Sequence, residues 1–174
     1  MDYDAERHIY SDGGQVIPSV TQLLGAYFHL DSRFYAPGAA ERGTRVHDLC
    51  ASYASGARGL VLDGYATAFA DWAYASGAEF VAVEKLIEGQ IGGRRYAGRL
   101  DLVALIHGRR VLVDLKTGAK AKWHHAQLAA YARAEQPHAA MLLYLSEDGT
   151  YRPEHLTAAQ LLEGLRVFRL ALEA

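Results

Sequence analysis

Residues 98–101 are GRLD and residues 110–116 are RVLVDLK, and these two stretches decide the fold. Each belongs to an apolar run rich in branched residues, 95–106 and 110–115, and such runs predict strands. His107-Gly108 lies between the two runs and predicts a turn, so the strands should pair as a hairpin. Folding back about that turn sets Asp101 roughly opposite Asp114.

The charged residues of this hairpin are predicted to converge. Side chains alternate along a strand, so Asp114 and Lys116 share one face and Leu115 points the other way. Two carboxylates are costly to bring together without a cation between them, and such hard oxygen ligands select Mg²⁺ or Mn²⁺. A nearby lysine can orient a water and neutralise developing phosphate charge. The alternative is a surface ion pair of little value, although both acids lie in apolar runs where an unpaired charge is expensive.

Helices are predicted before and after these strands. Residues 1–18 suggest an arm or a short hairpin that turns at Asp12-Gly13-Gly14. Ser19, Asp63 and Thr157 are the expected N-caps, and Thr157 forms a capping box with Gln160. The expected helices are 20–28, 39–55, 64–76, 123–135 and 158–172, and the expected strands are 79–91, 95–106, 110–115 and 139–145. This order predicts an α/β fold, with a small mixed β-sheet flanked by helices in one domain.

Composition excludes several classes of protein. The chain has 174 residues, 51% of them hydrophobic and 22% charged, which is typical of a globular protein and not of a disordered one. Its one cysteine, Cys50, excludes an internal disulfide framework and a four-cysteine zinc or iron–sulfur site. No apolar run is long enough for a membrane span, and the polar, acidic start MDYDAERHIY is unlike a signal peptide. We therefore expect a reducing, cytoplasmic setting.

The net charge of −2 is unevenly distributed along the chain. Residues 84–122 hold nine Lys or Arg against four Asp or Glu, and arginines outnumber lysines 14 to 4 in the whole chain. Arginine suits bidentate phosphate contacts, so this basic segment suggests an anionic partner. Ordinary solvated surface arginines explain the same counts, and charge alone does not separate the two explanations.

GRLDLV followed by VLVDLKTG resembles the core of the PD-(D/E)XK nuclease superfamily, in its RecB-like branch. Arg42-Gly43-Thr44-Arg45-Val46-His47 resembles the upstream G-x-x-x-H helix of that branch, and Gln127-x-x-x-Tyr131 resembles its downstream Q-x-x-x-Y helix. Pro18-Ser19-Val20-Thr21 resembles a segment of phage-type and mitochondrial members. Leu100 stands where the superfamily's proline would be, but RecB-like members usually show G-x-x-D there.

The resemblance implies a restriction-endonuclease-like core and assigns roles to single residues. The implied metal ligands are His47, Asp101, Asp114 and the backbone carbonyl of Leu115. Lys116 would be the catalytic lysine near the attacking water. Glu84 falls where the family often has an acid ahead of the first core strand, with Glu79 and Glu88 as nearby alternatives. The implied division is an N-terminal arm (1–17), a helical segment carrying His47 (18–77), a catalytic core (79–145) and a C-terminal helix (157–174).

Several further residues are candidates for DNA contact. Gln127 and Tyr131 are one helical turn apart and would lie beside the site, although Tyr131 is equally suited to the core. Arginines of the 94–110 hairpin could bind the phosphates of the DNA backbone without recognising the base sequence. Lys120, Lys122 and Trp123 would grip phosphate and stack a base, or only cap a helix start. The full set of candidates is Arg45, Arg99, Lys120, Lys122, Trp123, Gln127 and Tyr131.

The implied function is metal-dependent hydrolysis of DNA, with Mg²⁺ or Mn²⁺ and no iron–sulfur cluster. Histidine-containing RecB-like nucleases tend to act on ends or single strands, which favours an exonuclease in recombination, repair or phage replication. A helicase, a recombinase, a single-strand-binding protein and further copies of the chain are the candidate partners. The alternatives are a non-catalytic nucleic-acid-binding or assembly subunit, which the complete residue set disfavours, and an all-helical HD phosphohydrolase, suggested only by His47-Asp48.

Overall fold

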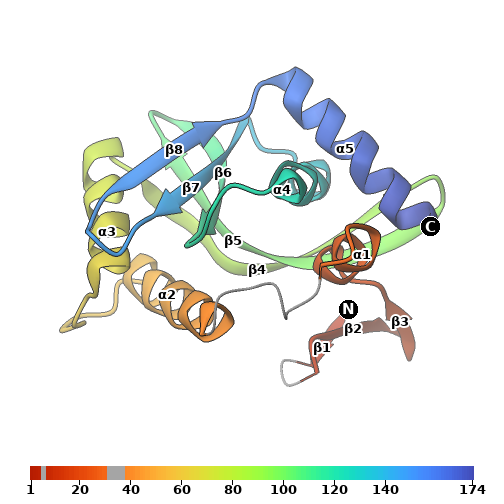
Figure 1. The fold of residues 1–174 in the computed structure, drawn as a ribbon, viewed down its shortest axis with the longest axis horizontal. Coiled ribbons are helices and arrows are strands. Elements are labelled where there is room, and N and C mark those ends of the chain that lie inside the picture. The colour runs from red at the N-terminus through yellow and green to blue at the C-terminus, as the bar shows by residue number, and fades with distance from the viewer. Residues whose placement is uncertain (5–6, 31–37) are drawn as a thin grey trace.

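The computed structural model describes residues 1–4, 7–30 and 38–174. Residues 5–6 of the predicted arm and 31–37 of the predicted helical segment lie outside the described part. A five-stranded mixed sheet with the strand order β4-β5-β6-β7-β8 forms the centre, and helices cover both of its faces (Figure 1). The predicted fold class is therefore confirmed. None of the helices within the described ranges is long and apolar enough to cross a membrane.

Three antiparallel strands follow one another along the chain: β4 (Glu79–Ile91), β5 (Arg94–Ile106) and β6 (Arg109–Lys116). His107 (φ 50°) and Gly108 (φ 75°) make the turn between β5 and β6, and a two-residue hairpin turn needs positive φ at both positions. The register runs from Ile106 opposite Arg109 to Leu102 opposite Val113. Continued by one residue, it sets Asp101 opposite Asp114, as the sequence predicts.

A helical crossover then changes the strand pairing from antiparallel to parallel. Helix α4 (Lys122–Glu135) leads from β6 to β7 (Ala139–Leu145), and these two strands pair in parallel. Six of the seven β7 residues are buried, because helices lie on both sides of this strand. Residues Tyr151–His155 form β8, antiparallel to β7. The sequence analysis missed β8, because it is a short polar strand that contains Pro153 and carries no alternating apolar signal.

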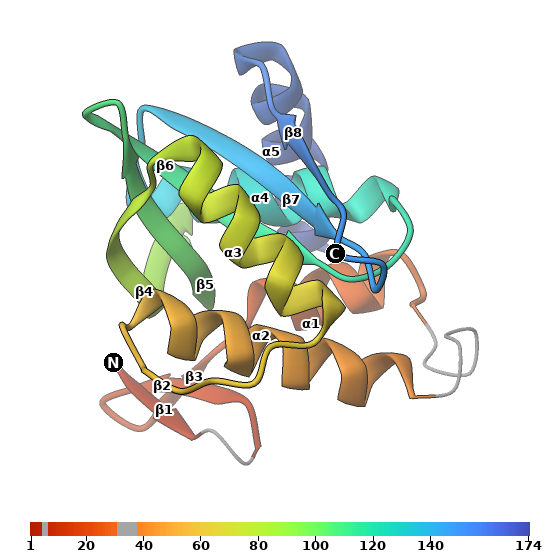
Figure 2. The same cartoon turned by 90° about the vertical axis from the view of Figure 1, so that its left-hand side faces the viewer.

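The two faces of the sheet are covered by different helices (Figures 1 and 2). Apolar residues of α1 (Val20–Tyr27), α4 and α5 (Ala158–Glu173) pack on one face, around Leu112, Leu142 and Phe168. Helices α2 (Ala39–Ala54) and α3 (Gly64–Ser76) pack on the other face. All five predicted helices and the four predicted strands are confirmed, each within one residue of its expected bounds.

The expected caps are also present. Ser19 Oγ accepts a hydrogen bond from the Gln22 amide at 3.0 Å, and Asp63 Oδ1 accepts one from the Ala66 amide at 2.9 Å. Thr157 and Gln160 form the predicted capping box at the start of α5.

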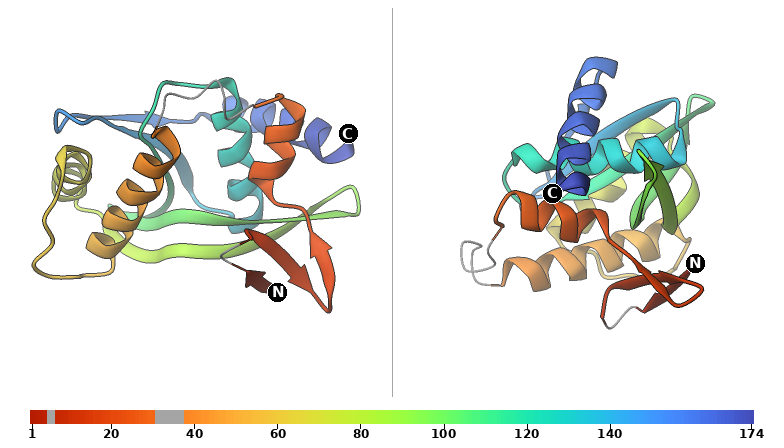
Figure 3. Two further views of the ribbon diagram at one scale, coloured as in Figure 1. Left: turned by 60° about the horizontal axis from the view of Figure 1, so that its bottom comes forward. Right: turned by 90° about the vertical axis from the view of Figure 1, so that its right-hand side faces the viewer.

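The N-terminal residues form a small antiparallel sheet rather than an arm or a lone hairpin. Strands β2 (Ile9–Asp12) and β3 (Gln15–Ile17) make the predicted hairpin, and β1 (Asp2–Asp4) adds a third strand that the sequence analysis missed. At three residues with two acids, β1 is too short to show a strand period. The sheet sits beside β5 (Figure 3), where the Ala97 amide donates to the Pro18 carbonyl at 3.0 Å.

Candidate active site

Strand β5 departs from a regular pleat at Asp101. Leu100 packs with α4 and α5, whereas Leu102 packs with α2 and α3. Residues two apart in a regular strand point to the same face, so the backbone must rotate at the residue between them. The neighbouring strand is irregular at the same level, because Glu84 has a φ of 49° and lies between the Val83–Leu102 and Lys85–Leu100 pairs. These two irregular positions both carry carboxylates.

His47, Glu84 and Asp101 come together from α2, β4 and β5. One ligand atom from each lies within 4.8 Å of the others, and all three side chains are partly buried. His47 Nδ1 is 3.2 Å from Asp101 Oδ1. One imidazole and two carboxylates make a donor set that suits Mn²⁺, and carboxylates also suit Mg²⁺. This cluster fits the divalent cation that the sequence analysis expected.

The charged groups of the cluster shift one another's pKa values. The negative charge of Asp101 raises the pKa of His47 to about 9. Burial would raise the pKa of Asp101, but the charges of His47 and Lys116 and a 2.7 Å hydrogen bond from the Leu115 amide hold it below its usual value. Burial and Asp101 together raise the pKa of Glu84. A protonated His47 therefore supplies the positive charge that two adjacent carboxylates require.

Asp114 and Lys116 form a second group next to the first. Asp114 is 2% exposed, and its Oδ2 lies 2.5 Å from Lys116 Nζ, without the geometry of a hydrogen bond. Burial raises the pKa of Asp114, and Lys116 opposes that shift. Lys116 Nζ also donates to Gln127 Oε1 at 2.7 Å and lies 5.3 Å from the centre of the Trp123 ring. The lysine is thus held from three sides.

The composition of the three-residue cluster differs from the predicted ligand set. The prediction grouped Asp114 with His47 and Asp101 and treated Glu84 as less certain. The cluster contains Glu84, whereas Asp114 is paired with Lys116. Of the two alternatives to Glu84, Glu88 pairs with Arg95 at 2.6 Å and Glu79 lies at the far end of β4, opposite Leu105. The fold thus selects Glu84 as the acid near His47.

Helix α4 supports Lys116 through Gln127 and Tyr131. Gln127 Nε2 donates to the Tyr131 hydroxyl at 3.3 Å, so the two share a face as predicted. Tyr131 is 3% exposed, and its ring lies against Gly98, where a Cβ would come within 2.7 Å of Cε1. The glycine of GRLD therefore allows α4 to approach β5. Burial raises the pKa of Tyr131, so its hydroxyl stays protonated.

Six of these residues line one cleft of about 550 Å³: His47, Asp101, Asp114, Lys116, Gln127 and Tyr131. Glu84 and Trp123 are not among its lining residues. The N-terminal segment supplies much of the remaining lining, which the sequence analysis did not anticipate. The one sequence signal for this part of the lining is the segment Pro18–Thr21, which leads into α1. In the structure this segment lies next to β5. The additional lining residues are Tyr3, Arg7, His8, Tyr10, Ser19, Thr21, Gln22, Gly98 and Arg99.

Only some of the predicted DNA contacts lie at this cleft. Arg99 lines it and pairs with Glu84 at 2.6 Å, and Trp123 lies beside Lys116. Lys120 pairs with Glu154 on β8, and Lys122 is exposed at the first turn of α4.

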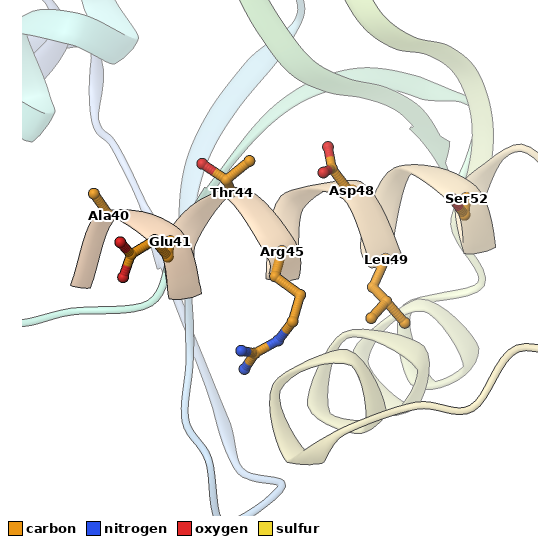
Figure 4. A pocket seen from close by; sticks show the side chains of 7 residues that line it. All are labelled: Ala40, Glu41, Thr44, Arg45, Asp48, Leu49 and Ser52. Atoms are coloured by element: carbon orange, nitrogen blue, oxygen red, sulfur yellow. The ribbon is translucent and has the colours of Figure 1, made fainter. Parts of the chain in front are cut away.

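Arg45 does not face the cleft. It lines a shallow hollow on the outer side of α2 with Glu41, Thr44 and Asp48 (Figure 4). Its guanidinium is 3.3 Å from Asp63. Arg45 and His47 are two residues apart on one helix and therefore point in different directions.

Comparison with known proteins identifies the family. A family model of the PD-(D/E)XK nuclease superfamily matches residues 26–166, which is most of the chain. The chain therefore belongs to the PD-(D/E)XK nuclease superfamily, as its sequence motifs predict. No curated protein gives a significant match.

Solved structures with a similar fold include a protein called SSO0001, with 18% identity and a TM-score of 0.52 over 92% of this chain and 78% of that one. An alkaline exonuclease from Laribacter hongkongensis is 12% identical, with a TM-score of 0.46 over 90% of this chain and 86% of that one. The same exonuclease in complex with dAMP gives 13% identity and a TM-score of 0.43. At these identities the similarity concerns the fold.

Proposed function

We propose that this protein is a DNA nuclease of the RecB-like branch that uses Mg²⁺ or Mn²⁺ to hydrolyse phosphodiester bonds. The observation that carries the proposal is that His47, Asp101, Asp114 and Lys116 line one cleft, with a Glu84 carboxylate oxygen within 4.8 Å of ligand atoms of His47 and Asp101. The proposal treats residues 1–174 as one nuclease domain. A role in recombination, repair or phage replication is proposed from the resemblance, and a reducing, cytoplasmic setting from the single cysteine.

His47, Glu84 and Asp101 would hold the cation, with Asp114 and the Leu115 carbonyl as further ligands next to them. A divalent cation bound there supplies a water of lowered pKa and neutralises charge on the phosphate. The Leu115 amide donates a hydrogen bond to Asp101 and so orients the carboxylate in advance of cation binding. Such preorganisation is worth several kcal/mol, because the groups need not rearrange during the reaction.

Lys116 is the group that acts on the substrate directly. Asp114 and Gln127 hold its ammonium at 2.5 Å and 2.7 Å, and because Lys116 is partly buried its electrostatic interactions are stronger than they would be in water. From that position Lys116 donates a hydrogen bond to the attacking water or to a phosphate oxygen. It thereby orients the water and stabilises the negative charge that develops in the transition state.

Action on DNA ends is proposed over internal cleavage. The cleft of about 550 Å³ is bounded on one side by the N-terminal sheet and has the volume of sites that bury one small ligand. A strand end fits such a site more readily than an intact duplex. The resemblance to histidine-containing RecB-like nucleases points the same way. A helicase, a recombinase or a single-strand-binding protein would supply such ends.

The proposal is tested by digestion of end-labelled linear single-stranded and double-stranded DNA beside a closed circle. Reactions contain Mg²⁺, Mn²⁺ or EDTA, with Lys116→Met and Asp101→Asn as test variants and Asp71→Asn as a matched control on the exposed side of α3. We expect metal-dependent loss of linear DNA, a fall of at least about 100-fold in both test variants, and full activity in the control.

Other outcomes separate the alternatives. Cleavage of the closed circle would replace exonuclease with endonuclease action. Activity that survives in Lys116→Met would contradict the role of the cleft. Salt-sensitive DNA binding without cleavage in either metal would favour the non-catalytic binding or assembly subunit.

A further inference from the structure

The N-terminal sheet and the turn before β2 form a second wall of the cleft that contains His47 and Asp101 of the candidate cation site. Tyr3, Arg7, His8 and Tyr10 all line this cleft, together with His47 and Asp101. Helix α2 and the N-terminal sheet both stand against strands β4 and β5 (Figure 3). A strand bound in this cleft is therefore expected to contact the N-terminal wall as well as the cluster.

This wall is anchored to the central sheet and is not a loose tail. Tyr10 and Ile17 pack with Ala97 of β5 in a small apolar core. At the rim, Arg95 of β5 pairs with Asp12 at 2.7 Å and with Glu88 of β4 at 2.6 Å. A wall fixed in this way sets the width of the cleft.

Arg99 links the wall to Glu84 of the candidate cation site. The Arg99 guanidinium lies 5.8 Å from the centre of the Tyr3 ring and pairs with Glu84 at 2.6 Å. Tyr3 in turn stacks on Tyr10, with ring centres 4.7 Å apart, and its hydroxyl is 2.9 Å from His8 Nδ1. Tyr3 therefore already contacts Arg99, Tyr10 and His8, and its role is to shape the wall. A different side chain of the wall must then contact a phosphate of the substrate.

Arg7 is that side chain. It lines the cleft, its side chain is 77% exposed, and its Nε lies 3.9 Å from Asp4, a distance too long for a strong ion pair. Among the residues that the structure describes, Arg99 and Lys116 are the other permanent cations lining the cleft, and they are already paired with Glu84 and Asp114. Arginine has the planar fork that matches phosphate oxygens.

We propose that Arg7 binds a backbone phosphate of an unpaired DNA strand, and that the N-terminal sheet selects single strands over intact duplex. This inference rests on the proposed nuclease function and names the form of its substrate. The volume of about 550 Å³ accommodates a nucleotide unit between the wall and the cluster. Because the wall is fixed along one side of this cleft, we expect it to obstruct the second strand of an intact duplex.

The test compares Arg7→Gln with wild type on a labelled single strand and on a blunt hairpin duplex. Arg7→Gln should raise KM for the single strand about 3- to 30-fold, with kcat changed less than about 2-fold, because the contact serves binding and not chemistry. The slope of log affinity against log salt should fall by about 0.7, the value for one phosphate on a single strand. Arg7→Lys should restore part of the affinity. Wild type should cleave the single strand at least about 10-fold faster than the blunt duplex.

Arg166→Gln is the matched control, because Arg166 is 76% exposed on α5 and outside the cleft lining. Equal KM values and salt slopes for Arg7→Gln and Arg166→Gln, or equal cleavage of single strand and blunt duplex, would overturn the inference. Fluorescence anisotropy in EDTA repeats the comparison without cleavage. Failure of wild type to cleave any DNA would refute the nuclease function, and the anisotropy arm would still decide whether Arg7 contacts a single strand.

Discussion

Glu84 combines two features that cost stability, a left-handed backbone angle and a half-buried carboxylate. A non-glycine residue at a φ of 49° in a strand costs about 1–2 kcal/mol, since the left-handed region brings Cβ close to the backbone. Its carboxylate is also half-buried near Asp101, which raises its pKa. A strained, partly buried acid is expected where a cation compensates for both costs. No periodicity of the sequence reports such a backbone angle, which is why Glu79 and Glu88 could not be excluded from sequence alone.

Replacement of Glu84 should stabilise the metal-free protein and reduce activity. Asparagine tolerates a positive φ better than glutamate, so Glu84→Asn should raise the free energy of unfolding by about 0.5–1 kcal/mol, even with the Arg99 pair lost. Glu84→Gln removes the charge but keeps the strain, and should gain less. Urea denaturation in EDTA measures both variants. Equal stability of the two would show that the strain is absent, and full nuclease activity in either would remove Glu84 from the site.

The His47–Asp101 pair should make stability depend on pH in the absence of metal. The pKa of His47 is raised from 6.5 to about 9, so the folded protein binds its proton more tightly than the unfolded chain. The resulting stabilisation is fully present below pH 6.5 and is lost as the pH rises through about 9. We expect wild type in EDTA to lose about 1–3 kcal/mol more than His47→Gln over this interval.

Urea denaturation at pH 6 and pH 9.5 measures this difference. Asp101→Asn, like His47→Gln, should lack the extra loss of stability that wild type shows at the higher pH. Parallel stability curves for wild type and His47→Gln would contradict the proposed pair. Because a cation needs the neutral imidazole, metal affinity should rise over the same pH range.

At the scale of elements, the close approach of helix α5 to α4 depends on one glycine. A Cβ at Gly164 would lie 2.5 Å from the His125 carbonyl oxygen, so only glycine allows this crossing. Gly164→Ala should lower the free energy of unfolding by about 1–3 kcal/mol, since one of the helices must move. Gly25→Ala in α1 is the control, with nothing within 4 Å of the new Cβ, and it should stabilise by up to about 1 kcal/mol. Thermal denaturation should move the two melting temperatures in opposite directions, and a shift in the same direction would contradict the packing.

The elements also show why sequence patterns succeed for some segments and fail for others. The sequence predicts the helices and the strands β4, β5, β6 and β7 well, because each is long enough to carry a clear apolar pattern. The bounds of each element were predicted from that pattern. Strands β1 and β8 are three and five residues long, lie at sheet edges and bury little, so tertiary pairing alone defines them.

At the scale of the molecule, the site lies where separate parts of the chain meet. His47 comes from a helix on one face of the sheet, Gln127 from a helix on the other face, and Arg7 from the turn before β2. The motif GRLD…DLK predicted the hairpin and the register that set Asp101 near Asp114. It could not predict the N-terminal wall, because that wall forms through long-range contacts of Tyr10 and Ile17 with Ala97.

The central claim is that His47, Glu84 and Asp101 form one divalent cation site next to Lys116. Its most direct test is a titration of the metal-free protein with Mn²⁺, with free Mn²⁺ followed by electron paramagnetic resonance. We predict saturable binding in wild type and in Asp71→Asn, weakened at least about 10-fold in both Asp101→Asn and Glu84→Gln. Binding of unchanged affinity in these two variants, or no saturable binding in wild type, would contradict the account.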